Sequence, residues 1–236
     1  MYYQQNIMML CNVLQAMRRF NVTTLIHSSS ATVYGHPQSD NNQLNESNTA
    51  QPLSPYGHSK LFQEQIITDA HNAGHLKRAC ILRYFNPVGA HSSGLIGEHP
   101  NGPPNNLMPA IAQAVVKYTT GDTSFVQLCI FGDDYPTKDG TGVRDYIHVM
   151  DLAKGHLQAL QHITNKPQFL DSFNLGTGTG HSVKEVIDCF EAVCGIKMDR
   201  KIVGRRPGDV PKLVACVEKA NRVLQFQCSH NLLDMC

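Results

Sequence analysis

The sequence has no tryptophan, and only 17% of its 236 residues are charged. Its 20 basic and 19 acidic residues leave a net charge of +1, so no strong field of one sign favours nucleic acid or an anionic membrane. No apolar run reaches the roughly 18 residues of a membrane-spanning helix, and the first residues lack the basic stretch of a secretory signal. We therefore expect a cytoplasmic protein whose partners are small molecules or other protein subunits.

The cysteines and histidines lack the spacing of metal or redox sites. The eight cysteines include no Cys-x-x-Cys pair, and most lie in apolar runs, as Cys80 does beside Ile81. This pattern favours reduced, packed thiols. Twelve histidines are scattered, and His71 and His75, one helical turn apart, lack the glutamate of a zinc protease motif. We expect no metal site.

Hydrophobic periodicity indicates alternating helices and strands. Residues 4–19 have helical spacing, 23–27 form an apolar β-branched strand, 55–73 a second helix and 78–84 a buried strand. This alternation predicts an α/β protein with a parallel sheet. In the second half we expect helices near 107–118, 151–163 and 183–193, with strands near 125–131, 143–148 and 173–175.

A candidate acid/base pair stands at the head of the second helix. Tyr56 and Lys60 are four residues apart, so a phenol and an ammonium share one helix face. The hydroxyls of Ser28, Ser30 and Thr32 lie at the carboxyl end of the preceding strand, where ligands bind in open α/β sheets. A free phenol has a pKa near ~10, and a neighbouring cation lowers it. The alternative to an acid/base pair is a purely structural helix, in which the tyrosine packs against the core and the lysine is solvated.

Seven strings, in chain order, resemble the UDP-glucose 4-epimerase (UDP-galactose 4-epimerase) family of the extended short-chain dehydrogenase/reductase superfamily. They are SSSATVYG (28–35), SPYGHSK (54–60), RYFNPVGA (83–90), PNNLMP (104–109), GTGVRDYIHVMD (140–151), NLGTG (174–178) and RRPGD (205–209). Related dehydratases resemble one another in carrying Thr-Asp-Glu where this chain has Ser30-Ala31-Thr32. Hydroxyls without carboxylates suit oxidation and reduction but offer no acid for eliminating water.

The resemblance implies a Rossmann-like, doubly wound parallel sheet with a smaller α+β substrate-binding domain. Residues 1–87 would be part of the NAD-binding domain and residues 88–236 mainly the UDP-sugar domain, with a strand near 171–176 returning to the sheet. The glycine-rich pyrophosphate motif of such domains, Gly-x-x-Gly-x-x-Gly or Gly-x-Gly-x-x-Gly, does not occur in this sequence. We expect the chain to be an incomplete Rossmann domain that also stops early at its carboxyl end, unstable alone and unable to retain NAD.

The same resemblance implies NAD-dependent 4-epimerisation of UDP-galactose and UDP-glucose through a 4-keto sugar. Tyr56 would be the base and then the acid, with its pKa depressed by Lys60 and by the nicotinamide cation. Ser30 and Thr32 would bind the sugar oxygen. The cofactor contacts that the resemblance implies come from Ser28, Tyr56, Lys60, Tyr84 and Phe85.

UDP-sugar contacts are implied for a second group of residues: Ser30, Asn86, Asn106, Leu107, Phe131, Arg144, Arg206, Asp209 and Leu213. Arginine can bind a diphosphate bidentately, yet Arg144 could instead pair with its neighbour Asp145, and Arg206 could be a solvated surface charge. Asn86 and Asn106 could equally form turns. Leu213 leaves open whether N-acetylhexosamines are accepted. We read residues 176–180, GTGTG, as a tight strand-to-helix turn.

Two functional hypotheses remain. The chain is part of a working epimerase, or it is a non-catalytic short form that pairs with a full-length epimerase. The family's homodimer face resembles a four-helix bundle built from the helices at 4–19 and 56–73, and both helices are present.

Overall fold

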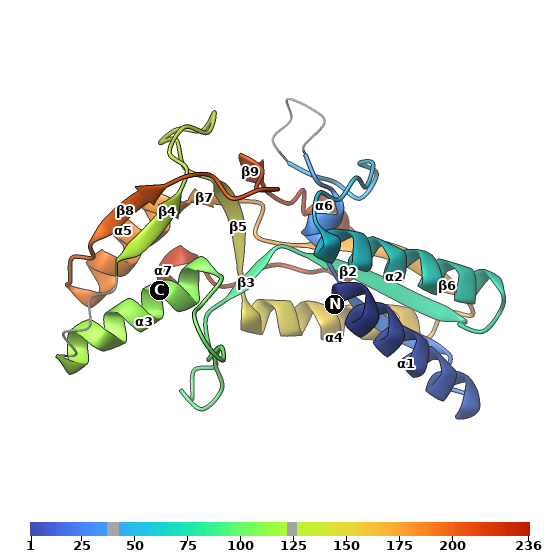
Figure 1. Ribbon diagram of the computed structural model, residues 1–236. Helices are drawn as coiled ribbons and strands as arrows, with labels where there is room; N and C mark the ends of the chain where they lie inside the picture. The colour runs from blue at the N-terminus through green and yellow to red at the C-terminus, as the bar shows by residue number, and fades with distance from the viewer. Residues whose placement is uncertain (37–42, 122–126) are drawn as a thin grey trace.

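The computed structural model describes residues 1–36, 43–121 and 127–236, which form two lobes (Figure 1). The helices, in chain order, are η1 (Tyr3–Ile7, π-helical), α1 (Met8–Arg19), η2 (Ala31–Val33, 3-10), α2 (Pro55–Asn72), α3 (Leu107–Thr120), α4 (Val149–Thr164), α5 (Val183–Cys194), α6 (Glu218–Leu224) and α7 (Leu232–Met235). The strands are β1 (Thr24–Ser30), β2 (Arg78–Tyr84), β3 (Asn86–Val88), β4 (Leu128–Phe131), β5 (Val143–His148), β6 (Phe169–Leu175), β7 (Gly180–Ser182), β8 (Arg200–Val203) and β9 (Lys212–Leu213).

The first lobe is built on a three-stranded parallel sheet in the order β1-β2-β6. Its register aligns Ser30 with Tyr84 and Tyr84 with Leu175, so the carboxyl ends of the three strands lie side by side. The five central residues of β2 are buried, as a strand covered on both faces requires. Because β1 pairs only with β2 within the described residues, β1 is an edge strand.

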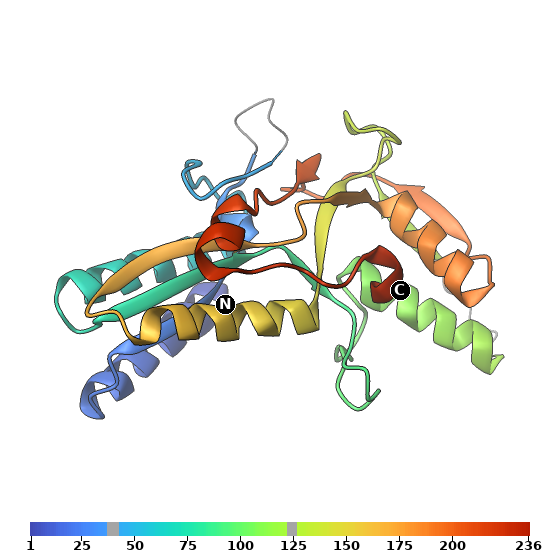
Figure 2. The ribbon, with the colours of Figure 1, turned by 180° about the vertical axis from the view of Figure 1, so that it is seen from behind.

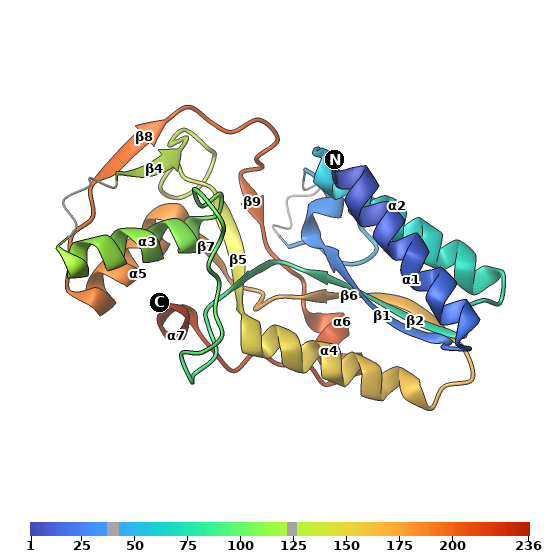
Figure 3. The same cartoon turned by 60° about the horizontal axis from the view of Figure 1, so that its bottom comes forward.

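Helices cover both faces of this sheet, with α1 and α2 on one side and α4 on the other (Figures 1 and 3). Alternate residues of β2 pack against the helices on the two opposite faces of the sheet, because successive side chains of a strand point to opposite faces. Ala79 and Ile81 pack with Leu10, Met17, Ile67 and Leu76 beneath α1 and α2. Cys80 and Leu82 pack with residues of α4, β6 and α6, including Ala159, Phe173 and Leu224.

The second lobe places α3 and α5 against short strands. Its core joins Ile111 of α3, Ile130 of β4 and Ile187 of α5, all fully or almost fully buried. Strand β5 pairs with β3, β7 and β9, and it leads directly into α4 of the first lobe (Figure 2). The strand β5 and the short segment after β2 thus connect the lobes, so the carboxyl end of the first sheet faces the second lobe.

The expected long helices and strands are present, with four adjustments. The first helix begins with a π-helical turn. The strand expected at 125–131 begins at Leu128, since Gln127 is not part of it, and residues 125 and 126 lie outside the described part. Residues 37–42 of the expected loop also lie outside it. The GTGTG segment does not run straight into a helix: Gly180–Ser182 first forms β7, paired with β5. In the described ranges, no helix has the length and apolarity to cross a membrane.

Candidate functional site

A short turn presents the hydroxyls at the end of β1. Ser30 caps the helical turn η2 by accepting from the backbone amide of Thr32, and the Thr32 hydroxyl donates to Ser30 Oγ over 3.0 Å. Short hydroxyl side chains favour such caps because they replace a missing backbone partner. Ser30 is buried and Thr32 is half-buried. The cluster is therefore held rigidly at the ligand-binding end of the sheet.

Helix α2 begins against this turn and positions Tyr56 and Lys60. Ser54 caps it by accepting from the Gly57 amide at 3.1 Å, and Pro55 occupies the first turn, where proline is best tolerated. A Cβ at Gly57 would lie 2.8 Å from the Thr32 carbonyl oxygen. Glycine at this position thus allows the helix to approach the Ser/Thr turn.

Tyr56 and Lys60 lie together, but their electrostatics differ from the expectation. Lys60 Nζ donates to the Ser28 carbonyl at 2.9 Å and lies 5.8 Å from the centroid of the Tyr56 ring. The expected depression of the Tyr56 pKa is wrong for this structure: burial, aided by Tyr84, raises that pKa against the effect of a hydrogen bond from Ser30. Burial also lowers the pKa of Lys60, against the attraction of Glu64. Tyr56 is a protonated phenol here.

A second set of polar groups lies beside the first. Ser28 Oγ is 2.8 Å from Nε2 of His156 on α4 and is also hydrogen-bonded to Tyr84. The Tyr84 and His156 rings are 6.2 Å apart. Phe85, by contrast, has its side chain buried in a hydrophobic cluster with Tyr34 and Leu213, so only its backbone can face a ligand.

Sequence patterns did not reveal the buried network under the site. Glu64 accepts from Ser29 Oγ at 2.5 Å and from the Arg83 guanidinium at 2.6 and 3.0 Å. Arg83 also donates to the Tyr34 hydroxyl, which donates to Asn174 at 2.7 Å. Buried charges persist only when they are paired in this way. The network fixes the strand end that carries Ser28 and Ser30.

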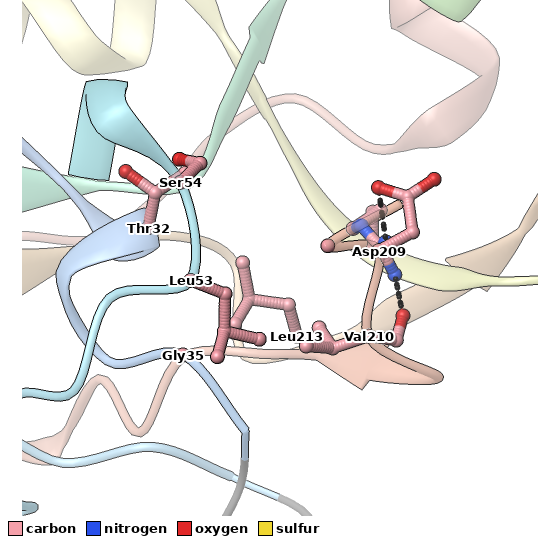
Figure 4. A pocket seen from close by; sticks show the side chains of 9 residues that line it. Thr32, Gly35, Leu53, Ser54, Asp209, Val210 and Leu213 are labelled. Atoms are coloured by element: carbon pink, nitrogen blue, oxygen red, sulfur yellow. Dashed lines mark hydrogen bonds and ion pairs between the residues drawn. The ribbon is translucent and has the colours of Figure 1, made fainter. Parts of the chain in front are cut away.

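A pocket opens between the Ser/Thr turn and the second lobe (Figure 4). Thr32 and Ser54 face it from one side, Asp209 and Val210 from the other, and Leu53 and Leu213 lie between. It encloses about 100 Å³, which is less than a whole sugar nucleotide needs, so a ligand of that size would extend over the neighbouring surface.

Arg144 lines this pocket and does not pair with Asp145. Its guanidinium donates to the Val210 carbonyl at 2.8 Å and lies 3.5 Å from the Asp209 carboxylate. Asp145 points to the opposite face of β5, where it is fully buried and accepts from the backbone amides of Thr177, Gly178 and Ala215. Neighbouring residues of a strand face opposite sides, which excludes the ion pair.

A second cationic side chain, that of Arg206, lies on the second lobe. The Arg206 guanidinium lies 3.7 Å from the centroid of the Phe131 ring and donates to the Asn105 carbonyl at 3.1 Å. Arg206 is therefore not an isolated surface charge. Asn106 and Leu107 follow at the start of α3, where the exposed Asn106 occupies the N-cap position without a side-chain capping bond. Asn86 is half-buried in β3, paired in register with Tyr146.

Comparison with known proteins extends over the whole chain. The family model described as "NAD dependent epimerase/dehydratase family" matches residues 1–176. The UDP-glucose 4-epimerase of Bacillus subtilis (strain 168) is 46% identical over 235 residues, and the chain covers 67% of that protein. A plant relative, UDP-glucose 4-epimerase GEPI42 of Cyamopsis tetragonoloba, is also 46% identical, with 64% of it covered. The chain thus spans about two thirds of the length of these curated relatives.

Solved structures of UDP-glucose 4-epimerases share this fold. The enzyme from Stenotrophomonas maltophila, with bound NAD and formylated UDP-arabinopyranose, superposes with a TM-score of 0.90 at 44% identity. The enzyme from Bifidobacterium longum, in complex with NAD+ and UDP, gives 0.89 at 45% identity. Each comparison covers 99% of this chain and 67% of the other. Because the family model matches about three quarters of its residues, the chain belongs to the NAD dependent epimerase/dehydratase family.

Proposed function

We propose that this site performs the acid/base and substrate-binding part of NAD-dependent 4-epimerisation of UDP-galactose and UDP-glucose. One observation carries the proposal: Thr32 belongs both to the hydroxyl cluster next to Tyr56 and to the pocket that contains Arg144 and Asp209. A sugar joined to a diphosphate could therefore reach the phenol while its phosphates remain near the arginine.

In this proposal Tyr56 takes the proton of the sugar 4-hydroxyl and later returns it. Because Thr32 donates to Ser30 and Ser30 to the Tyr56 oxygen, the series stabilises the phenolate as it forms. The Lys60 ammonium uses one of its three protons on the Ser28 carbonyl, which leaves two for a ligand. Its charge beside the ring also favours the phenolate form.

NAD would supply the hydride acceptor and donor of the reaction. The donors present at the end of β1 and β2 fit the nicotinamide ribose: Ser28, Lys60 and Tyr84 converge there, with Tyr56 alongside and Phe85 offering its backbone. Residues 1–87 would thus provide the nicotinamide side of the site and residues 88–236 mainly the UDP-sugar side.

The nucleotide would bind across the second lobe. Arg144 and Arg206 are the cations for the diphosphate, and Asp209 can accept from the ribose hydroxyls. Phe131 and Leu107 offer apolar surface for the base, and Asn86 and Asn106 offer amides. Since Arg206 stacks on Phe131, base binding there would use the free face of the ring or displace the guanidinium.

We also propose pairing through the first two helices. Large apolar side chains are exposed along this face, namely Tyr2, Tyr3, Met8, Met9, Val13, Phe20 and Phe62. Several exposed large apolar side chains on neighbouring helices are typical of a subunit interface. It supports a homodimer, and it equally favours the second candidate function, a non-catalytic partner of a longer epimerase.

One experiment separates the two candidates. The chain and its Tyr56→Phe variant are assayed with added NAD on UDP-galactose and on UDP-N-acetylgalactosamine, and binding of UDP and of NAD is measured in parallel. A working epimerase interconverts UDP-galactose and UDP-glucose, and Tyr56→Phe abolishes turnover while UDP binding persists. Binding of both UDP and NAD without turnover in either protein would favour the non-catalytic partner. Unchanged turnover in Tyr56→Phe would remove the phenol from its assigned role.

A further inference from the structure

His156 joins the site from the opposite layer of the sheet. It lies on α4, on the face of the sheet away from α2, and Ser28 is 128 residues before it in the chain. Gly155 allows this approach, because a Cβ there would lie 2.9 Å from Leu175 Cδ1 and 3.1 Å from Phe226 Cε2. With no side chain at position 155, α4 packs closely enough for His156 to reach the end of β1.

The two nitrogens of the His156 ring have different partners. Nδ1 is 2.9 Å from the Leu152 carbonyl oxygen, and Nε2 is 2.8 Å from Ser28 Oγ. A carbonyl can only accept, so the neutral ring carries its proton on Nδ1. The Nε2 atom is then an acceptor, and the hydroxyl proton of Ser28 must point toward it.

This direction fixes the orientation of the Ser28 hydroxyl. A serine hydroxyl has one proton. Since Ser28 donates that proton to His156, its Oγ has no second proton to give to another neighbour. The Ser28 side chain is therefore held by α4, while its backbone carbonyl accepts from Lys60 of α2. Tyr84 is close enough to Tyr56 for its charge to raise the Tyr56 pKa.

We propose that His156 is a positioning residue for Tyr56. By accepting from Ser28, it holds the end of β1 whose carbonyl receives the Lys60 ammonium, and so fixes the place of that ammonium beside the Tyr56 ring. This role rests on the proposed function, and no part of it depends on His156 touching the substrate.

The ring tautomer tests the hydrogen-bond direction without any turnover. We expect the ¹⁵N resonances of His156 in the free protein to report a protonated Nδ1 and an unprotonated Nε2 at neutral pH, assigned by comparison with His156→Gln. A proton on Nε2 would overturn the proposal, because Ser28 could then no longer donate to the ring. A chain without turnover would count against the proposed function, and the tautomer would still decide this inference.

Kinetics test the positioning role. In His156→Phe we expect kcat to fall roughly tenfold, with KM changed by less than about twofold, since the lost hydrogen bond acts on the base and not on substrate binding. In His156→Gln the amide oxygen can accept from Ser28, and we expect more than about half of kcat to remain. His162→Phe, also on α4 but packed at Phe169, is the matched control and should leave kcat unchanged. Equal losses in His156→Phe and His156→Gln, or no loss in His156→Phe, would refute the proposal.

Discussion

Replacing Glu64 with glutamine should strongly destabilise the first lobe. The carboxylate is 6% exposed and binds the Arg83 guanidinium through bonds of 2.6 and 3.0 Å. Glutamine keeps the shape and can still accept from Ser29, but it removes the charge and turns an amide group toward the Arg83 donors. Arg83, itself 9% exposed, would remain as a buried cation without its counterion.

The expected cost follows from this geometry. Removing one partner of a buried ion pair costs roughly 3–5 kcal/mol, because the remaining charge stays desolvated. Arg83 retains its hydrogen bond to the Tyr34 hydroxyl, so we expect about 3 kcal/mol, at the lower end. Urea unfolding followed by far-UV circular dichroism measures it, since the chain has no tryptophan to report by fluorescence. The midpoint should fall by about 1–2 M urea.

A matched control and a double variant make the test specific. Glu98→Gln, on an exposed loop, should change stability by less than about 0.5 kcal/mol. Adding Arg83→Met to Glu64→Gln should recover part of the loss, because the unpaired cation is removed. A loss below about 1 kcal/mol in Glu64→Gln, or no recovery in the double variant, would refute the reasoning that this pair is desolvated and holds the site.

Two further predictions concern stability. Burial, with a smaller contribution from the Lys60 charge, lowers the pKa of His27 from 6.5 to about 4. As the pH falls, the unfolded chain therefore binds the proton first. The free energy of unfolding should fall by up to about 3 kcal/mol between about pH 6.5 and 4 and level off below pH 4. His27→Val should flatten this part of the pH profile, and an unchanged slope in that variant would contradict the prediction. Gly176→Ala should destabilise by at least about 2 kcal/mol in thermal unfolding, because its Cβ would lie 2.6 Å from Asp145 Oδ2 and 2.8 Å from Ala215 Cβ; a wild-type midpoint would show that the backbone yields.

The sequence predicted the elements and the proximity of Tyr56 to Lys60 because both are local. Helical spacing, caps and β-branched runs specify α2 and β1, and the four-residue separation places Tyr56 and Lys60 on one face. Strand alternation alone would have excluded the pairing of Arg144 with Asp145, but its actual partner, Asp209, lies far along the chain.

The remaining contacts of the site depend on packing between segments that are distant in the sequence. Nothing in the local pattern links Ser28 to His156 or Glu64 to Arg83, which meet only when α4 and β2 assemble on the sheet. The raised pKa of Tyr56 has the same origin. Burial sets its direction, and burial is a property of the folded site that residue spacing does not encode.

The central claim is that this chain carries a UDP-sugar site next to Tyr56, and calorimetric titration with UDP tests it most directly. We predict saturable one-site binding to the chain and to Tyr56→Phe, and at least tenfold weaker binding to Arg144→Met, because a cation for the diphosphate is lost. Thermal unfolding of Arg144→Met serves as its folding control. No saturable binding to the chain, or equal binding to Arg144→Met, would contradict the account.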